Sequence, residues 1–209
     1  MRKIFLSFVF AITAFVANAQ FTVIPKIGFS TANIVSSPTP NSAVTTTGIQ
    51  LGLACDMRVT DIFSIQPELL FIQKGKKNKT SSVIGSASST HTLNYLEIPL
   101  LAKLKFGNDN VKFYVAAGPS LGILVSADYK SVFGNSITRE KFDVGWSKDD
   151  DYKPTDIGAQ FGAGLMLGNF VFDVRYGLGL SNIFPDDNAS DYNEKNRAFG
   201  ITIGYAIAL

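Results

Sequence analysis

The sequence is poor in the side chains on which most catalytic and metal sites depend. Its 209 residues include one His, one Cys and one Trp, and charged residues make up only 17% of the chain. The single cysteine, Cys55, cannot form an internal disulfide, and it has few potential partners for binding a transition metal. These shortages weigh against most enzyme and metal-centre classes, and we expect no cofactor.

Two further features are missing: a long apolar run and an excess of basic charge. After residue 19, no segment approaches the roughly 20 apolar residues that a membrane-spanning helix needs. Without Arg2 and Lys3, which belong to a predicted leader, the chain keeps 17 basic and 17 acidic residues. This balance does not support a nucleic-acid partner, which requires a clustered basic surface. Any membrane insertion must therefore use strands.

The first residues follow the order of a secretory signal peptide. Arg2 and Lys3 precede an apolar run over Ile4–Val16, and Ala17-Asn18-Ala19 forms a small-x-small cleavage site. We predict a signal peptide over residues 1–19, cleavage before Gln20, and one mature domain over residues 20–209. Export of this kind is typical of envelope proteins.

From Gln20 onward the dominant pattern is an alternation of apolar and small or polar residues, which is typical of strands with two different faces. In the last segment, for example, Phe199, Ile201 and Ile203 alternate with Gly200 and Thr202. Each segment is long enough for a tilted membrane-spanning strand, which needs about 9–11 residues. Eight such segments are predicted, at residues 21–33, 48–58, 62–74, 92–106, 111–127, 155–167, 170–182 and 198–209.

The connections alternate in length, as an up-and-down transmembrane β-barrel requires. Short turns are predicted at residues 59–61, 107–110 and 168–169, and long polar loops at residues 34–46, 75–91, 128–154 and 183–196. The fold class that follows is all-β: an eight-stranded antiparallel barrel in the outer membrane of a Gram-negative bacterium. We expect the long loops to be extracellular and both termini periplasmic.

The less apolar face of the strands indicates which side is the interior. It consists mostly of Gly, Ala, Ser, Thr and Gln with isolated ions, whereas a soluble lipocalin-like barrel would need a densely charged exterior. A barrel of eight strands has room inside only for side chains. We therefore predict a polar lumen network of Lys26, Asp56, Arg58, Glu68, Lys74, Glu97, Lys103, Lys105, Lys112, Asp173 and Arg175.

Three prolines conflict with this strand assignment. Pro67, Pro99 and Pro119 lie inside consecutive predicted strands, where each removes a hydrogen-bond donor from the sheet. A closed barrel has no edge strand that could accommodate them. We therefore predict bulges or locally missing hydrogen bonds at these positions.

Several motifs resemble the PorT-like outer-membrane β-barrel family over nearly all of the mature chain. They are Pro67-Glu68-Leu69-Leu70, Gln73-Lys74-Gly75, Tyr95-Leu96-Glu97-Ile98-Pro99-Leu100-Leu101-Ala102-Lys103 and Ala117-Gly118-Pro119. The resemblance implies a membrane barrel and permits a role in secretion of surface proteins. It implies no catalytic residues. The chain ends in Leu209 where Phe is usual, although the alternation needed by the barrel-assembly machinery is kept.

The remaining candidates for chemistry lie in the predicted loops. His91 follows Ser88, Ser89 and Thr90 and could pair with a hydroxyl nucleophile, but no acidic residue adjoins it. An outer-membrane lipid-modifying enzyme is therefore an alternative, and a soluble lipocalin-like lipid binder is another. Our principal interpretation is a non-enzymatic barrel that contacts outer-membrane lipid, lipopolysaccharide and a surface or secretion partner. The predicted contacts are Lys76, Lys77, Lys79, Trp146 and Tyr152.

Overall fold

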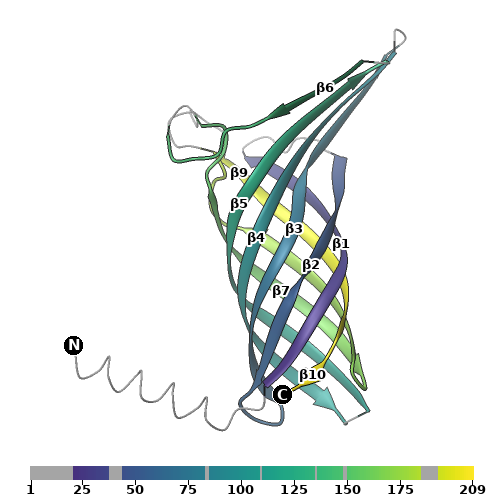
Figure 1. Ribbon diagram of the computed structural model, residues 1–209, viewed down its shortest axis with the longest axis vertical. Coiled ribbons are helices and arrows are strands. Elements are labelled where there is room, and N and C mark those ends of the chain that lie inside the picture. Colours follow the sequence, from purple (N-terminus) through teal and green to yellow (C-terminus); the bar gives the residue numbers. More distant parts are fainter. Residues whose placement is uncertain are drawn as a thin grey trace, which may run out of the picture.

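A computed structural model gives the architecture of residues 21–37, 44–82, 85–108, 110–134, 136–147, 150–184 and 193–209. The predicted leader lies outside these described residues. The chain forms a closed antiparallel barrel from which strands project at one end (Figure 1). The strands are β1 (Phe21–Ser37), β2 (Val44–Arg58), β3 (Phe63–Ser82), β4 (Gly85–Gly107), β5 (Val111–Phe133), β6 (Ser136–Lys141), β7 (Thr155–Leu167), β8 (Phe170–Gly179), β9 (Asn193–Tyr205) and β10 (Ile207–Ala208).

The barrel closes where the first and last long strands meet. β1 pairs with β9 from Lys26 opposite Gly204 to Ser37 opposite Asn193, and β10 continues along β1 in the same register. The order around the ring is β1-β2-β3-β4-β5-β7-β8-β9, which confirms the predicted eight-stranded antiparallel barrel for the described residues. Leu209 N donates to Phe21 O at 2.9 Å, so the first and last described residues lie at the same rim.

The three tight turns lie at this rim, which we call the turn end. Short connections join β2 to β3, β4 to β5, and β7 to β8 there, as predicted. Gly168 adopts φ 55° between β7 and β8, a left-handed conformation that costs glycine little. The opposite rim, which we call the outer end, carries the longer connections.

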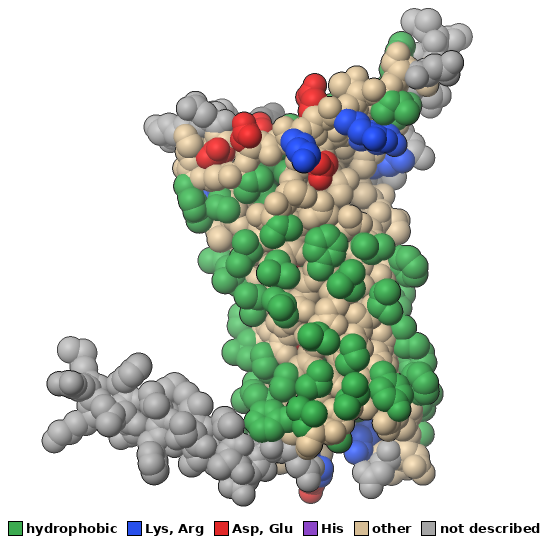
Figure 2. All heavy atoms as spheres, viewed as in Figure 1, with side chains coloured by type: hydrophobic (Ala, Val, Ile, Leu, Met, Phe, Trp, Pro, Cys, Tyr) green, Lys and Arg blue, Asp and Glu red, His purple; other side chains and the backbone are tan. Residues whose placement is uncertain are grey.

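The outside of the barrel is apolar and its inside is polar. Figure 2 shows hydrophobic side chains around the whole visible wall, with charged side chains only near the two ends. Within the wall, exposed aromatic residues include Phe29, Phe113, Phe161 and Tyr205, whereas Lys103 and Glu68 are buried. This is the reverse of a soluble barrel, so the lipocalin-like alternative is wrong. Among the described residues, no helix is long and apolar enough to cross a membrane.

Much of the predicted loop sequence is strand instead. β3 and β4 form a hairpin through the predicted loop at residues 75–91, and β5 continues to Phe133 before β6 returns beside it. These four strands extend beyond the barrel as a sheet, which we call the projection (Figure 1). The loops were overpredicted because this sheet carries mostly polar side chains on both faces, which obscures the apolar alternation although main-chain pairing continues.

The prolines interrupt the sheet without changing its register. Pro67 lies in a gap of the β2–β3 ladder, Pro99 in a gap of the β3–β4 ladder and Pro119 in a gap of the β4–β5 ladder. On its other side, Pro119 keeps its place opposite Ala159 in the β5–β7 ladder. The predicted local gaps are therefore confirmed at all three prolines, and none of them coincides with a bulge. The register shifts of these sheets occur elsewhere, at residues 45–50 and 94–95.

Candidate functional site

One group of ions fills the lumen nearer the turn end. Glu68 is the centre of this group: Arg175 NH1 donates to its Oε2 at 2.8 Å, and Lys26 Nζ lies 3.3 Å from its Oε1. The other guanidinium nitrogen of Arg175 donates to Asp173 at 2.8 Å, and Tyr114 donates to the same carboxylate oxygen at 2.6 Å. Alternation along β1, β3, β5 and β8 points all five side chains inward, where each ion meets an opposite charge.

A second pair of cations shares Asp56 beside this group. Lys103 Nζ lies 3.0 Å from Asp56 Oδ2, and Lys105 Nζ lies 2.8 Å from Oδ1. Lys103 also donates to Gln66 Oε1 at 2.8 Å, and its ammonium stands 3.9 Å from the ring centroid of Tyr114. A buried cation thus has a carboxylate, an amide and an aromatic face around it.

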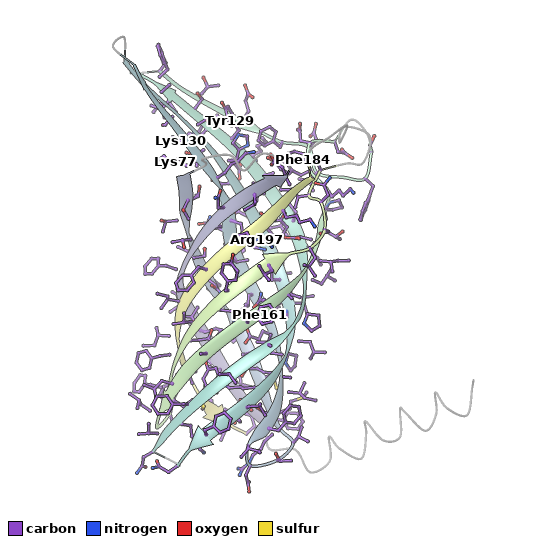
Figure 3. The ribbon with its side chains drawn as sticks, turned by 180° about the vertical axis from the view of Figure 1, so that it is seen from behind. Lys77, Tyr129, Lys130, Phe161, Phe184 and Arg197 are labelled. Atoms are coloured by element: carbon purple, nitrogen blue, oxygen red, sulfur yellow. The ribbon has the colours of Figure 1, made fainter. Side chains whose placement is uncertain are left out.

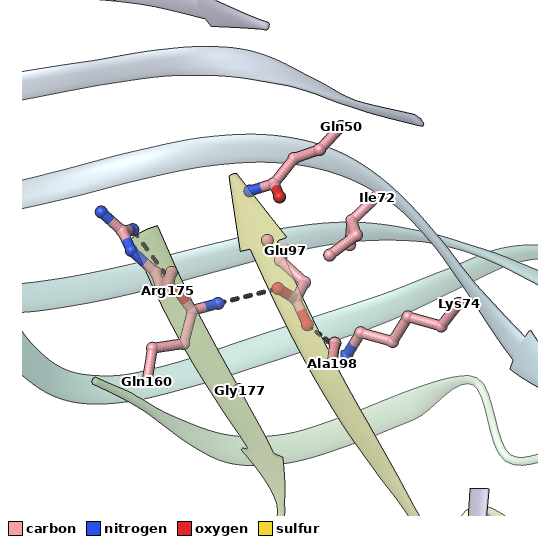
Figure 4. A pocket seen from close by; sticks show the side chains of 9 residues that line it. Gln50, Ile72, Lys74, Glu97, Gln160, Arg175, Gly177 and Ala198 are labelled. Atoms are coloured by element: carbon pink, nitrogen blue, oxygen red, sulfur yellow. Dashed lines mark hydrogen bonds and ion pairs between the residues drawn. The ribbon is translucent and has the colours of Figure 1, made fainter. Parts of the chain in front are cut away.

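The second group lies nearer the outer end and is joined to the first by Gln160. Lys74 forms an ion pair with Glu97 and lies 3.5 Å from Asp156. Gln160 donates to Glu97 at 2.8 Å and accepts from Arg175 at 3.4 Å (Figure 4). The space left between these side chains is about 20 Å³, with another 10 Å³ beside Asp156. A single water needs about 10–15 Å³ by this measure, so the lumen is filled.

An aromatic cluster closes the outer end of the lumen. Tyr152 and Ile183, from the connections after β6 and β8, are buried against Leu93 and Tyr95 of β4. Lys153 N donates to Ile183 O at 2.8 Å, which ties the two connections together. We call this cluster, which also contains His91, Tyr129, Phe142 and Phe184, the mouth plug.

The electrostatics of the mouth plug centre on His91, which lies on β4 outside the membrane-spanning part of the strand. Its ring stacks on Phe142 with centroids 5.4 Å apart, and its Nδ1 lies 3.3 Å from Tyr152 Oη. Burial, with a smaller contribution from the positive charge of Lys76, lowers the pKa of His91, and Glu194 partly opposes this. Burial also raises the pKa of Tyr152. Both groups are therefore neutral at pH 7.

The structure brings most of the predicted lumen residues together. Eight of the eleven are buried in the interior, namely Lys26, Asp56, Glu68, Lys74, Glu97, Lys103, Asp173 and Arg175. Lys105 reaches Asp56 from the turn end, and Lys112 is half-buried there. Arg58 does not belong to the lumen: its side chain is 44% exposed and pairs with Asp61 in the β2–β3 turn. It lies at the end of its strand, where the interior opens to solvent.

Two of the predicted loop contacts are wrong. Tyr152 is only 2% exposed because it packs between Phe142 and Phe184 in the mouth plug. Lys76 points inward and pairs with Glu194 at 3.1 Å. Trp146 is 70% exposed, in keeping with a contact role. Lys77 lies on the outward face of β3, whereas the side chain of Lys79 lies outside the described part of the chain.

Sequence reasoning missed the neutral members of the network and two of its acids. Gln66, Gln160 and Asn196 are buried and hydrogen-bonded to ions or to Tyr95. The inward positions of Gln66 and Gln160 were visible in the alternation, but glutamine was treated as lumen filler, and Asn196 fell in the predicted loop at residues 183–196. Asp156 lies one residue inside β7, whose bounds were predicted correctly, so its inward position was available and was missed. Glu194 lies one residue inside β9, in sequence that was predicted as a loop.

The last strand of the projection, β6, is paired along one edge only. β6 pairs with β5 and with no other strand in the described ranges, so its second edge is open. Phe133 and Ile137 near the tip of this hairpin are 63% and 57% exposed. An open edge presents main-chain N–H and C=O groups to which an extended segment of a partner can pair.

An apolar wall, closed strand pairing and a charged interior define a transmembrane β-barrel protein. The chain belongs to the outer membrane protein beta-barrel domain family, whose model matches residues 17–185. It is therefore an outer-membrane β-barrel protein.

Similar solved structures include Ail, the attachment invasion locus protein of Yersinia pestis (13% identity, 90% of this chain and 99% of that chain, TM-score 0.43). OprG of Pseudomonas aeruginosa is similar at 13% identity, with 90% and 96% coverage and a TM-score of 0.42. The outer membrane enzyme PagL is similar at 13% identity, with 89% and 99% coverage and a TM-score of 0.44. No curated protein matches the sequence.

Proposed function

We propose that the protein is a non-enzymatic surface-binding component of the outer membrane, in which the barrel is a closed anchor and the projection is the binding element. The observation that supports this most directly is the lumen, which is packed with ion pairs around spaces of about 20 and 10 Å³. What remains available for binding is the projection, with the open edge of β6 and the exposed Trp146 nearby.

The proposal also specifies how the barrel is oriented in the membrane and what kind of partner it binds. The leader over residues 1–19 exports the chain, the barrel-assembly machinery inserts it, and the turn end with both termini faces the periplasm. The projection then faces the cell exterior. The resemblance to the PorT-like family supports a partner in envelope assembly or protein secretion, and the open edge of β6 suits an extended segment of such a protein.

The absence of catalysis is also part of the proposal. His91 stacks on Phe142 and contacts Tyr152, and among the described residues no serine or threonine hydroxyl forms a hydrogen bond with its ring. We expect that His91→Ala leaves the acyl-chain composition of lipid A and phospholipids unchanged, with Lys195→Gln as a surface control. A change in acyl turnover caused by His91→Ala alone would support the lipid-modifying alternative.

The decisive experiment shortens the projection and keeps the barrel. Lys130 and Arg139 are paired across β5 and β6, so residues 131–138 can be replaced by Asn-Gly, which forms a tight hairpin turn. In a strain that lacks the protein, the full chain should restore the normal set of surface-exposed proteins, measured by surface biotinylation. The shortened chain should fold, as judged by its heat-modifiable migration, and fail to restore that set. Full restoration by the shortened chain contradicts the proposal.

A further inference from the structure

A row of cations crosses the outward face of the projection. The strand registers place Lys77 opposite Thr90, Thr90 opposite Lys130, and Lys130 opposite Arg139. Residues paired in this way share one face of a sheet, and neighbouring strands are about 4.8 Å apart. Like charges directly opposite each other destabilise a sheet, so an anion bound beside Lys130 and Arg139 would relieve their repulsion.

The described residues do not supply enough negative charge. Asp128 is the acidic residue on this face, and its register partner is Lys141, one row closer to the barrel. Glu140 pairs with Tyr129 and so faces the mouth plug. Within the described ranges, no ion pair reaches Lys77, Lys130 or Arg139. Figure 2 shows Lys and Arg side chains above the hydrophobic wall, with a few Asp and Glu side chains near them.

A polar crevice adjoins this row. β2 and β3 part where their register shifts between Thr45 and Gln50, and the space between them is about 480 Å³. Its lining contains hydroxyls, an amide and one cation, with no carboxylate: Thr45, Thr46, Thr47, Gln73, Lys77, Thr90 and Thr92. Thr46 Oγ1 is buried and has no hydrogen-bond partner among the described residues.

The position of the crevice indicates which kind of anionic molecule could bind there. Lys77 and Lys130 stand on the projecting strands just beyond the barrel wall (Figure 3). Toward the turn end, the same outward face carries Leu69 on β3, Ile98 on β4 and Val125 on β5, all exposed in the apolar band. A molecule bound here therefore meets cations and hydroxyls at one end and a hydrocarbon-facing surface at the other.

We propose that this crevice and cation row bind the phosphorylated headgroup of an outer-leaflet glycolipid, with its acyl chains along the apolar wall below. Lys77, Lys130 and Arg139 contact the phosphate oxygens, and the threonine hydroxyls contact the sugar. This site adds a lipid ligand to the proposed function. It depends on the proposed orientation, because the crevice lies at the headgroups of the outer leaflet only if the projection faces the cell exterior.

The test titrates the folded, detergent-solubilised full chain with bisphosphorylated lipid A, dephosphorylated lipid A, inorganic phosphate and a phosphorylated peptide. Binding should follow the order bisphosphorylated lipid A, then dephosphorylated lipid A, with the other two weaker, and it should weaken with added salt. Each cation near a charged lipid surface contributes enough that the triple variant K77Q/K130Q/R139Q should lose about a hundredfold in affinity.

Matched single variants locate the effect. Lys130→Gln should lose about fivefold, whereas Arg58→Gln, beside the β2–β3 turn at the opposite rim, should change affinity by less than about twofold. Equal affinity for the two lipid A forms overturns the proposal, as does an unaltered triple variant or stronger binding of the phosphopeptide. Maleimide labelling of a cysteine at position 139 on intact cells tests orientation separately. If that label fails, the surface-binding function fails with it; if only the titration fails, the lipid site alone is wrong.

Discussion

Arg175 and Glu68 stand 107 positions apart in the chain and meet across the lumen, with NH1 2.8 Å from Oε2. The contact joins β8 to β3, strands that are not neighbours in the ring. It therefore links opposite parts of the barrel wall through the interior, and it can form only when the barrel is closed.

Removal of Glu68 should strongly destabilise the barrel. Glu68→Ala leaves Lys26 and Arg175 buried without their shared carboxylate, and the loss of one partner from a buried ion group costs about 3–5 kcal/mol. The measurement is urea unfolding in lipid vesicles, followed by heat-modifiable migration. Arg58→Ala is the control, since it removes an exposed ion pair worth about 0–1 kcal/mol. Equal losses in the two variants would show that the network is not a structural support.

The barrel should not conduct ions. The charged groups fill the lumen, and the spaces among them, about 20 and 10 Å³, are each about the size of a single water. Purified protein in planar lipid bilayers should therefore show no unitary conductance above that of protein-free bilayers. Reproducible channel steps that scale with protein concentration would contradict a filled lumen.

Two inward-facing glycines should respond differently to an added methyl group. A Cβ at Gly164 would lie 2.2 Å from Tyr114 Cζ and 2.4 Å from Phe172 O, so Gly164→Ala must displace the tyrosine that donates to Asp173. A Cβ at Gly177 would meet nothing closer than 3.8 Å. Gly164→Ala should cost about 1–3 kcal/mol by overpacking. Gly177→Ala should be neutral or stabilise by up to about 1 kcal/mol. Urea unfolding of both variants checks this, and similar values for both would contradict the packing described.

The mouth plug should loosen as the pH falls. The folded pKa of His91 lies below its usual value because of burial and Lys76, so the plug's contribution to stability is complete above about pH 6.5. It is lost as the pH falls through the folded pKa, because protonation then places a charge among aromatic rings. Since this is the single histidine, its ring resonances in a micelle NMR titration are unambiguous. Phe142→Ala should raise the pKa toward 6.5 by exposing the ring; an ordinary pKa in the unaltered protein would contradict the burial.

The barrel itself could be predicted from the sequence because membrane strands have a regular two-residue period. The inward direction of Glu68 and Arg175 follows from that period along β3 and β8. Their contact does not follow, since the pairing across the lumen depends on the stagger with which the ring closes. The same holds for Asn196, whose partners Tyr95 and Asp156 come from distant strands.

The outer end was harder to predict, for a different reason. Lys76 and Lys77 are adjacent, yet one pairs with Glu194 inside and the other lines the outward crevice. The sequence around them is polar on both faces, so no apolar stripe indicates direction. Tyr152 illustrates the same limit: an aromatic residue in a polar connection can anchor a partner or pack inward, and only tertiary structure distinguishes the two.

The most direct test of the membrane barrel uses the lone Cys55. It lies on the outward face of β2 between Leu53 and Met57, in the apolar band, whereas its neighbour Ala54 faces the interior. A nitroxide attached to Cys55 before the chain is folded into lipid vesicles should be accessible to oxygen and inaccessible to a water-soluble nickel chelate. The outward, lipid-facing wall described here predicts that result; ready access of nickel to the label would contradict it.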